Sequence, residues 1–427
     1  MQHFTHKCCI FLRMQIKEFV PAERIRVCMP MNAQTKELIK SFMLLIFQVF
    51  LFWLPPRKNR VMVYVHARRG VTCNPKYIVR KLHEMYGSQL EIIWTTSYPE
   101  TCGELQAMGL EVTAFSKKNV WKYLRTKVYI TNDAFPSWAL HRHGQVWINT
   151  WHGGMNYKHI GYGYLPPMNV CERALFRLEN RKPDVFLSGS RFFTEDTSRS
   201  FCFPAKVFVP TGLPRNDLFF GKREDTASLV RMRLGIPIED NVVLYAPTFR
   251  KELTSRADGM DFKRLTSALQ GRFGGSWSVL FRDHCFIEKG SRQIPNVTDV
   301  SDYPDMQELL LVSDVLVSDY SSCMWDFCLT GNPCFVFAGD QEEYEQTDRG
   351  YACPMEKWPY MAAYDMEQLE QNIRSFDAEG YSQKVTTHLQ EMKSYDKGNA
   401  AWQVAEMIGA FCNTDRKDKS DITITKG

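Results

Sequence analysis

The chain lacks the features that mark metal-binding, disulfide-stabilised and nucleic-acid-binding proteins. None of its 13 cysteines forms a CxxC pair and no His/Cys group has metal-ligand spacing. Many of the cysteines lie in apolar runs, which is typical of reduced thiols in a cytosolic protein. A net charge of only +5 argues against a dominant basic face for nucleic acid. The 44% hydrophobic and 24% charged content is that of a globular protein, and 427 residues suffice for two domains.

The apolar stretch near the start of the chain, residues 42–54, is too short to span a membrane. It holds roughly 13 residues, whereas a spanning helix needs about 20, and it lacks a signal-peptide cleavage site. Basic residues flank it on both sides, namely Lys36, Lys40, Arg57, Lys58 and Arg60. We therefore predict a helix that lies in the surface of an anionic bilayer. A core helix of the first domain is the alternative.

From Arg60 onward, short apolar runs alternate with longer amphipathic stretches, a pattern typical of parallel sheets with crossover helices. The predicted strands of the first half are residues 61–65, 90–94, 111–114, 128–131, 146–149, 185–188 and 207–209. After a loop at 210–220 and a helix at 222–233, the second half has strands at 242–245, 278–281, 297–300, 315–317 and 334–338. Helices at 365–376 and 382–412 are expected to close the fold. Two α/β halves of similar size predict a cleft between them, with ligands at the carboxyl ends of the strands.

In the first half, the segment Asn149-Thr-Trp-His-Gly-Gly-Met-Asn-Tyr-Lys158 directly follows a predicted strand. His152 lies beside Gly153, where a substrate can approach the backbone, and an imidazole there can act as a general base. A histidine that only caps the strand in a tight turn is the alternative. The nearby Lys158 favours an anion-binding site.

In the second half, cationic and hydroxyl groups recur where predicted strands end. The guanidinium fork of Arg250, beside Thr248, matches phosphate oxygens. The turn at 318–322 precedes a helix, so free N–H groups and the hydroxyls of Ser321 and Ser322 favour phosphate binding. An ordinary serine N-cap is the alternative. The other groups predicted at this rim are Arg282, His284, Ser318, Asp319, Asp340 and Arg349.

Between the halves, the sequence offers charged side chains but no acidic pair for a metal. Arg215 and Asp217 are predicted either to point into the cleft or to form a structural pair at a hinge. No Asp-X-Asp triplet lies in the cleft-forming loops. Charge on a diphosphate is therefore expected to be neutralised by arginines, histidine and a helix start rather than by a dedicated metal site. A Mg²⁺ ion that accompanies a nucleotide remains compatible with this pattern.

The order of the motifs along residues 60–400 is more specific than any one of them. They are Trp151-His-Gly-Gly with Lys158 and Gly161, Pro214-Arg-Asn-Asp217, Ala246-Pro-Thr-Phe-Arg250, Arg282-Asp-His284, Ser318-Asp-Tyr-Ser-Ser322 with Asp326, and Tyr344 with Arg349-Gly350. This set resembles the CDP-glycerol:poly(glycerophosphate) glycerophosphotransferases of teichoic-acid and capsule synthesis. The chain departs from the usual family pattern at His284-Cys285, where the family has His-Pro, and at Asn156-Tyr157-Lys158, where it has Pro-Leu-Lys.

The resemblance implies a GT-B architecture, in which two Rossmann-like domains face each other across a cleft. We expect an acceptor domain at 57–220, a CDP-donor domain at 221–412 and a disordered tail at 413–427. The segment 1–56 is expected to hold the membrane-associating helix. The resemblance also implies peripheral attachment at the cytoplasmic face of the cell membrane.

The same resemblance implies transfer of glycerol phosphate, or a related alditol phosphate, from CDP-glycerol to a hydroxyl of a membrane-linked glycan or polyol-phosphate acceptor, with release of CMP. No cofactor is required by the sequence, and Mg²⁺ is optional. His152 and His284 are the expected catalytic residues, with His152 as the base and His284 at the donor phosphate. The expected donor-binding residues are Thr248, Arg250, Arg282, Ser318, Asp319, Ser321, Ser322, Asp340 and Arg349, and the expected acceptor-binding residues are Gly153, Lys158 and Arg215. A GT-B glycosyltransferase that uses a nucleotide sugar and a non-catalytic scaffold protein are the alternatives.

Overall fold

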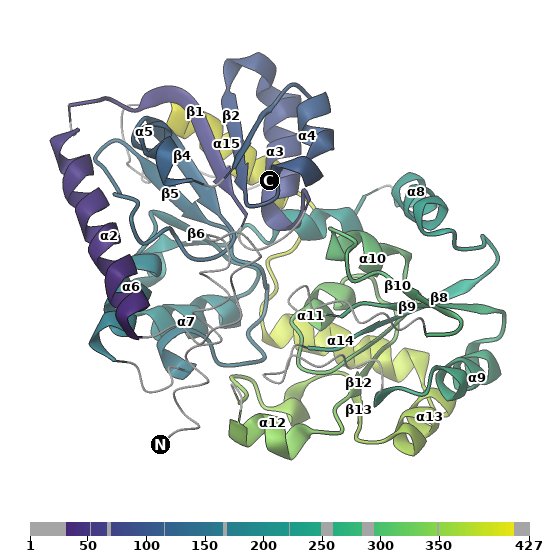
Figure 1. Cartoon of the computed structure of the whole chain (residues 1–427). Helices are drawn as coiled ribbons and strands as arrows, with labels where there is room; N and C mark the ends of the chain where they lie inside the picture. Colours follow the sequence, from purple (N-terminus) through teal and green to yellow (C-terminus); the bar gives the residue numbers. More distant parts are fainter. Residues whose placement is uncertain are drawn as a thin grey trace.

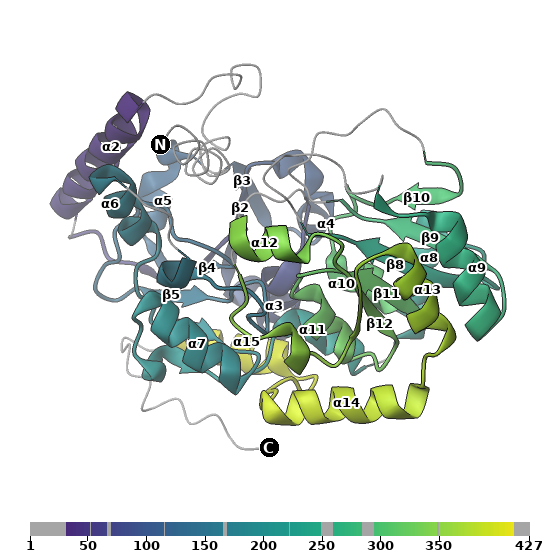
Figure 2. The same cartoon turned by 90° about the horizontal axis from the view of Figure 1, so that it is seen from below.

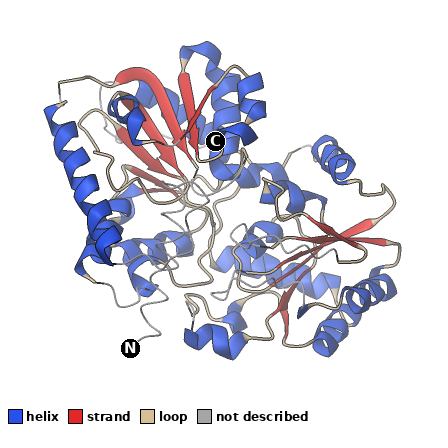
Figure 3. Cartoon of the chain, viewed as in Figure 1, coloured by secondary structure: helices blue, strands red, loops and turns tan. Residues whose placement is uncertain are grey.

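The computed structural model describes residues 31–51, 53–65, 70–114, 116–164, 169–221, 223–248, 259–283, 294–347 and 350–413. Its strands form two sheets, one in each half of the chain (Figures 1 and 3). The first sheet has seven strands in the order β3-β2-β1-β4-β5-β6-β7, and the second has six in the order β10-β9-β8-β11-β12-β13. All the strand pairs are parallel, which confirms the predicted pair of Rossmann-like units.

The first sheet and its helices come from the N-terminal half. The strands are β1 (Arg57–Tyr64), β2 (Glu91–Thr96), β3 (Glu111–Ala114), β4 (Thr126–Thr131), β5 (Val146–Asn149), β6 (Val185–Leu187) and β7 (Phe208–Val209). The helices are α2 (Met31–Phe50), α3 (Cys73–Tyr86), α4 (Gly103–Ala107), α5 (Val120–Leu124), α6 (Val170–Glu179) and α7 (Arg191–Phe201). The short helix η8 (Pro214–Phe219) occupies the predicted loop between the halves.

The second sheet is built from the C-terminal half. Its strands are β8 (Asn241–Ala246), β9 (Trp277–Phe281), β10 (Val297–Asp299), β11 (Val315–Ser318), β12 (Cys334–Phe337) and β13 (Met361–Ala363). Its helices are α8 (Glu224–Leu234), α9 (Phe262–Phe273), α10 (Met306–Val312), α11 (Cys323–Cys328), α12 (Gln341–Thr347), α13 (Met366–Arg374) and α14 (Ala378–Glu391). The sequence analysis missed β13.

Strand β1 shows why apolar runs mark the buried strands of this fold. Successive side chains of a strand point to opposite faces of the sheet, so both faces of a central parallel strand need apolar residues. Val61 and Val63 belong to the core on one face, and Met62 and Tyr64 belong to the core on the other. The unbroken apolar run at 61–64 therefore reflects a strand that is covered on both sides.

The last helix, α15 (Ala400–Asn413), corrects the predicted domain boundaries. Val404, Ile408 and Phe411 pack in the same core as Val61 and Val63 of β1, so α15 covers the first sheet. In Figure 1 the yellow α15 accordingly lies among the elements of the first half. The expected donor domain at 221–412 therefore ends before α15, because α15 packs with the N-terminal half. Periodicity predicts an apolar face on this helix, but it does not identify the sheet that the face covers.

Helix α2 lies along α6 at the outer edge of the first half in both views (Figures 1 and 2). Two of its polar residues face the protein: Ser41 Oγ is 3.0 Å from Ser137 Oγ, and Gln48 Nε2 donates to the Trp138 carbonyl at 2.6 Å. Leu44 packs against a core of the first half. Most of the other apolar residues face outward, and the exposed ones are Ile39, Phe42, Met43, Ile46, Phe47, Val49 and Phe50. This orientation rules out the alternative of an ordinary core helix. No helix in the described part of the chain combines the length and apolar character that a membrane crossing requires.

Candidate active site

The turn after β5 places His152 at the carboxyl edge of the first sheet. The side chain of Asn149 accepts a hydrogen bond from the Trp151 N–H at 2.8 Å, which folds the chain back directly after the strand. Trp151 has a φ of 51°, in the left-handed region that a bulky side chain rarely adopts. Such a conformation persists only where surrounding contacts enforce it, and it is concentrated at functional sites.

The imidazole of His152 is held on two sides. Its Nδ1 lies 2.8 Å from the carbonyl oxygen of Asn132, which follows the neighbouring strand β4. Its ring stacks on Trp151, with centroids 4.6 Å apart. Because a carbonyl can only accept, this contact requires the proton on Nδ1, and Nε2 is then the nitrogen that can take up a proton.

The far end of the same loop is embedded in the second half of the protein. Tyr157 is buried in the core of the second sheet, and its hydroxyl lies 2.9 Å from that of Tyr360 and 3.2 Å from Nε2 of His388. Its carbonyl accepts from the Ala352 N–H at 3.0 Å. Burial lowers the pKa of His388 to about 4, so this contact involves a neutral imidazole at neutral pH. The loop that begins with His152 therefore bridges the two halves.

The predicted donor turn, residues 318–322, follows the central strand β11 of the second sheet. Ser318 and Asp319 hold its base, because Ser318 Oγ donates to the Ala246 carbonyl at 2.7 Å and Asp319 accepts from the Thr248 N–H at 2.8 Å. Ser321 and Ser322 come next and are half-buried. The two serines lie at the rim of the sheet, whereas Ser318 and Asp319 anchor the start of the turn to the end of the neighbouring strand β8.

The histidine turn and the serine turn face each other at close range. A Cβ atom placed on Gly153 would lie 3.2 Å from Ser322 Oγ. One placed on Gly154 would lie 2.6 Å from the indole nitrogen of Trp325, in α11. The absence of side chains at these two glycines is what allows the turns to meet. The carboxyl ends of the two sheets thus converge where the sequence predicts the cleft.

The other predicted donor residues lie partly outside the described ranges. Arg282 is at the rim, where Nη1 donates to the Tyr303 carbonyl at 2.7 Å, and Asp340 accepts from the Tyr320 hydroxyl at 3.1 Å. Lys158 pairs through its backbone with Tyr351 of the second half. The predictions for Arg250, His284 and Arg349 fall on residues that the structure does not describe.

The prediction that Arg215 binds the acceptor is corrected by its burial. Arg215 is 6% exposed, and Nη2 donates to Oδ2 of Asp326 in α11 at 2.5 Å. Asp217, the partner considered from sequence, instead accepts from the N–H groups of Ala400 and Ala401 at the start of α15. The structure therefore favours the hinge alternative, with Asp326 as the partner of Arg215.

Sequence reasoning missed Asn74, the second residue of α3. Its side chain is fully buried, and Nδ2 donates to the carbonyls of Thr150 and Trp151, each at 3.0 Å. No motif marks this asparagine, because its importance depends on a contact 76 residues away in the chain. A helix start with Asn beside Pro75 predicts only local capping.

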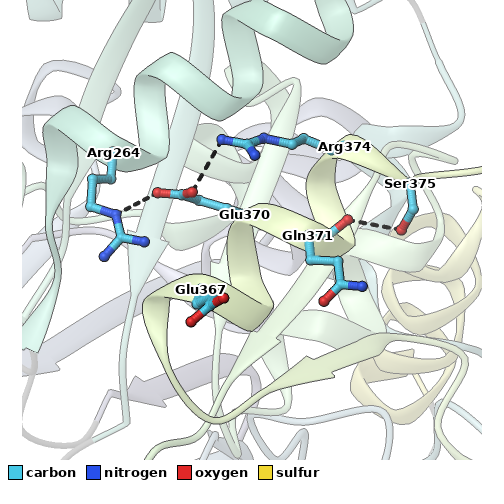
Figure 4. Close-up of a pocket in the computed structure, with 6 residues that line it drawn as sticks. All are labelled: Arg264, Glu367, Glu370, Gln371, Arg374 and Ser375. Atoms are coloured by element: carbon cyan, nitrogen blue, oxygen red, sulfur yellow. Dashed lines mark hydrogen bonds and ion pairs between the residues drawn. The ribbon is translucent and has the colours of Figure 1, made fainter.

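A depression of about 560 Å³ lies on a different part of the second half, between α9 and α13 (Figure 4). Its lining residues are Arg264, Glu367, Glu370, Gln371, Arg374 and Ser375, and Glu370 pairs with both arginines. None of the predicted site residues lines it. Among the described residues, no group of three or more His, Cys, Asp or Glu side chains is placed to hold a metal ion.

Two parallel sheets that converge on a histidine turn and a serine turn define a two-domain transferase architecture of the GT-B type. The chain belongs to the CDP-glycerol:poly(glycerophosphate) glycerophosphotransferase family, whose model matches residues 46–410. It is therefore a glycerophosphotransferase, and the activity expected from its motifs, transfer of glycerol phosphate from CDP-glycerol, is that of the family.

Similar proteins include a teichoic acid glycerol-phosphate transferase of Staphylococcus aureus (strain NCTC 8325 / PS 47), 28% identical over 367 residues that cover 83% of this chain and 93% of that protein. A teichoic acid poly(glycerol phosphate) polymerase of Bacillus subtilis (strain 168) is 26% identical over 363 residues, which are 81% of this chain and 48% of the polymerase. The chain thus spans about half the length of that relative. The wall teichoic acid polymerase TagF shares the fold, with a TM-score of 0.73 at 22% identity over 90% of this chain and 99% of the TagF chain.

Proposed function

We propose that the chain transfers glycerol phosphate from CDP-glycerol to a hydroxyl group of a teichoic-acid-type acceptor at the membrane surface, with His152 as the general base. The observation that carries this proposal is the close approach of Gly153 to Ser322, which puts the histidine turn against the serine turn. The family and the teichoic-acid relatives support the donor and the acceptor class.

In the proposed reaction, the acceptor oxygen attacks the β-phosphorus of CDP-glycerol while Nε2 of His152 takes up the hydroxyl proton. A new P–O bond forms to the acceptor, the P–O bond to the α-phosphate breaks, and CMP leaves. The Nδ1–H contact with the Asn132 carbonyl supports this role, because it fixes the tautomer in which Nε2 is basic. Most of the rate enhancement would come from positioning and from charge stabilisation.

On the donor side, Ser321 and Ser322 would contact the diphosphate. Their place directly after the base of the turn, with Ser322 facing Gly153, supports that role. The other predicted donor-binding residues remain predictions; they are Thr248, Arg250, Arg282, His284, Ser318, Asp319, Asp340 and Arg349. Gly153 and Lys158 remain the predicted acceptor contacts.

The substitution His152→Ala tests the proposed division of labour. We expect CMP release from CDP-glycerol to be abolished, while CDP-glycerol still binds with nearly wild-type affinity in calorimetry. His143→Ala is the matched control, because His143 is exposed and lies before β5 rather than after it. Equal loss of turnover and donor binding in His152→Ala would contradict the assignment. Release of UDP from a UDP-sugar, with no CMP from CDP-glycerol, would favour the glycosyltransferase alternative.

We also propose that α2 attaches the protein to the membrane surface. The outward apolar side chains of α2 support this, since a contiguous exposed apolar face marks an interaction site. The exposed Lys36, Lys40 and Lys58 would attract anionic lipid. Arg60 does not belong to this basic group, because it is buried and bonded to Glu91 at 2.7 Å.

Sedimentation with lipid vesicles tests the attachment. We expect the wild type to pellet with phosphatidylglycerol vesicles and the double variant Ile46→Asp, Phe50→Asp to stay in solution. Ile238→Asp is the matched control, since Ile238 is 80% exposed but lies in the second half, remote in sequence from α2. If all three proteins pelleted equally, α2 would not be the attachment site.

A further inference from the structure

The side chain of Asn74 binds the backbone of the histidine turn at the residue before His152. Nδ2 donates to the carbonyl oxygens of Thr150 and Trp151, each at 3.0 Å. The Trp151 carbonyl is part of the peptide group that joins Trp151 to His152. The amide of Asn74 therefore binds the peptide group that directly precedes His152. The side chain of Asn74 is itself fully buried.

These hydrogen bonds hold a strained conformation in place. Trp151 adopts a φ of 51°, which is unfavourable for a residue with a large side chain. The N–H of Trp151 donates to the side chain of Asn149, a local contact, and its carbonyl accepts from Asn74, which lies 77 residues away in the chain. The Trp151 carbonyl also accepts from the hydroxyl of its neighbour Thr150 at 3.2 Å, so Asn74 supplies the bond to this carbonyl that comes from a different element, α3. Loss of the Asn74 bond would weaken the restraint on the peptide before His152.

The same side chain connects the histidine turn to the donor half. Oδ1 of Asn74 accepts from the backbone N–H of Arg215 at 3.1 Å. The guanidinium of Arg215 in turn pairs with Asp326, and Asp326 lies in α11, the helix that follows Ser321 and Ser322. One continuous chain of hydrogen bonds thus runs from the peptide before His152 to the helix behind the serine turn.

We propose that Asn74 is a positioning residue that sets the place of His152 relative to the donor turn. It acts through the turn and takes no part in proton transfer, since it is buried away from any substrate. This inference rests on the proposed role of His152 as the general base. It predicts that loss of the Asn74 amide impairs the chemical step and leaves donor binding intact.

Steady-state kinetics of Asn74→Ala test the inference. We expect kcat to fall by about 10- to 100-fold, because a displacement of roughly 1 Å at a reacting group costs that much, while KM for CDP-glycerol stays near the wild-type value. Asn74→Ser keeps one hydroxyl donor, so its kcat should lie between those of the wild type and Asn74→Ala. If Asn74→Ala does not fold, the serine variant is used for the same measurement. Asn332→Ala is the matched control, because the side chain of Asn332 likewise donates to a backbone carbonyl, that of Ser313 at 3.0 Å, but lies in the second half outside this hydrogen-bond chain.

A double variant separates a positioning role from a purely structural one. Because steady-state turnover of His152→Ala is expected to be lost, the comparison uses residual CMP release in long incubations with enzyme in excess of CDP-glycerol. If Asn74 acts through His152, Asn74→Ala should lower this release in the wild type but cause no further loss in the His152→Ala background. Similar kcat values for Asn74→Ala and Asn332→Ala, or a further loss in the double variant, would overturn the inference. Wild-type turnover of His152→Ala alone would refute the proposed base, whereas an inactive His152→Ala with a fully active Asn74→Ala would refute only the positioning role.

Discussion

Gly154 is the position where a single added methyl group should disturb both stability and catalysis. A Cβ atom there would lie 2.6 Å from Nε1 and 2.8 Å from Cδ1 of Trp325, and 3.3 Å from Cδ1 of Leu213. Since carbon atoms prefer a separation of about 3.5–4.0 Å, the turn or the indole must move by roughly 1 Å. The φ of Gly154 is not in the left-handed region, so the conflict is one of space alone.

The indole of Trp325 cannot easily retreat. It is fully buried and packs edge-on against His388, with ring centroids 5.7 Å apart. Overpacking a rigid site of this kind costs about 1–3 kcal/mol of unfolding free energy. If the turn moves instead, His152 moves with it, and a shift of about 1 Å lowers turnover by up to roughly 100-fold. We therefore expect Gly154→Ala to lower both quantities.

Chemical denaturation and CMP release measure the two effects of Gly154→Ala. Gly271→Ala is the matched control, because a Cβ there meets nothing within 4 Å and the residue lies inside α9. Alanine in a helix interior is more favourable than glycine by about 0.5–1 kcal/mol, so this control should be as stable as the wild type or more so. Wild-type stability and turnover in Gly154→Ala would refute the argument that the two turns are in direct contact.

Three further predictions concern buried charges. Arg215→Met leaves the buried carboxylate of Asp326 without its cationic partner and should lower the unfolding free energy by about 3–5 kcal/mol in urea titrations. A loss below about 1 kcal/mol would contradict the buried Arg215–Asp326 ion pair. Burial lowers the pKa of His388 from 6.5 to about 4, so protonation favours the unfolded chain, and stability is lost as the pH falls from 6.5 toward 4. Thermal unfolding at pH 7 and 5 should show a smaller drop in His388→Gln. Burial raises the pKa of Asp396 to about 7, so the folded protein holds this proton more tightly than the unfolded chain and loses stability as the pH rises from 3.8 toward 7. Denaturation at pH 5 and 8 should show this loss in the wild type, and Asp396→Asn should remove it.

Much of the fold follows from the sequence because buried parallel strands need apolar residues on both faces. The run at 315–317 and the run at 146–149 became β11 and β5 for that reason. Strand β13 was missed because Met361-Ala-Ala363 is short and low in the β-branched and aromatic residues that mark strands.

The site was predictable where a motif follows a strand, and not where it depends on contacts distant in sequence. His152 and Ser322 each follow a predicted strand, and parallel topology places each of them at the carboxyl edge of its own sheet. The partners of Arg215 and Asn74 depend on how the halves pack, which local patterns do not encode. An arginine in a turn looks the same in sequence whether it faces a ligand or a buried carboxylate.

The return of α15 to the first sheet means that the polypeptide passes between the halves twice, once before α8 and once after α14. The first half is therefore not a contiguous piece of the gene, whereas the second half, from α8 to α14, is. A fragment that ends near residue 220 would lack Val404, Ile408 and Phe411, which cover one face of β1. That apolar face would be exposed to water, so the fragment would be expected to aggregate. Expression of the first lobe on its own would need residues 400–413 joined back through an engineered linker.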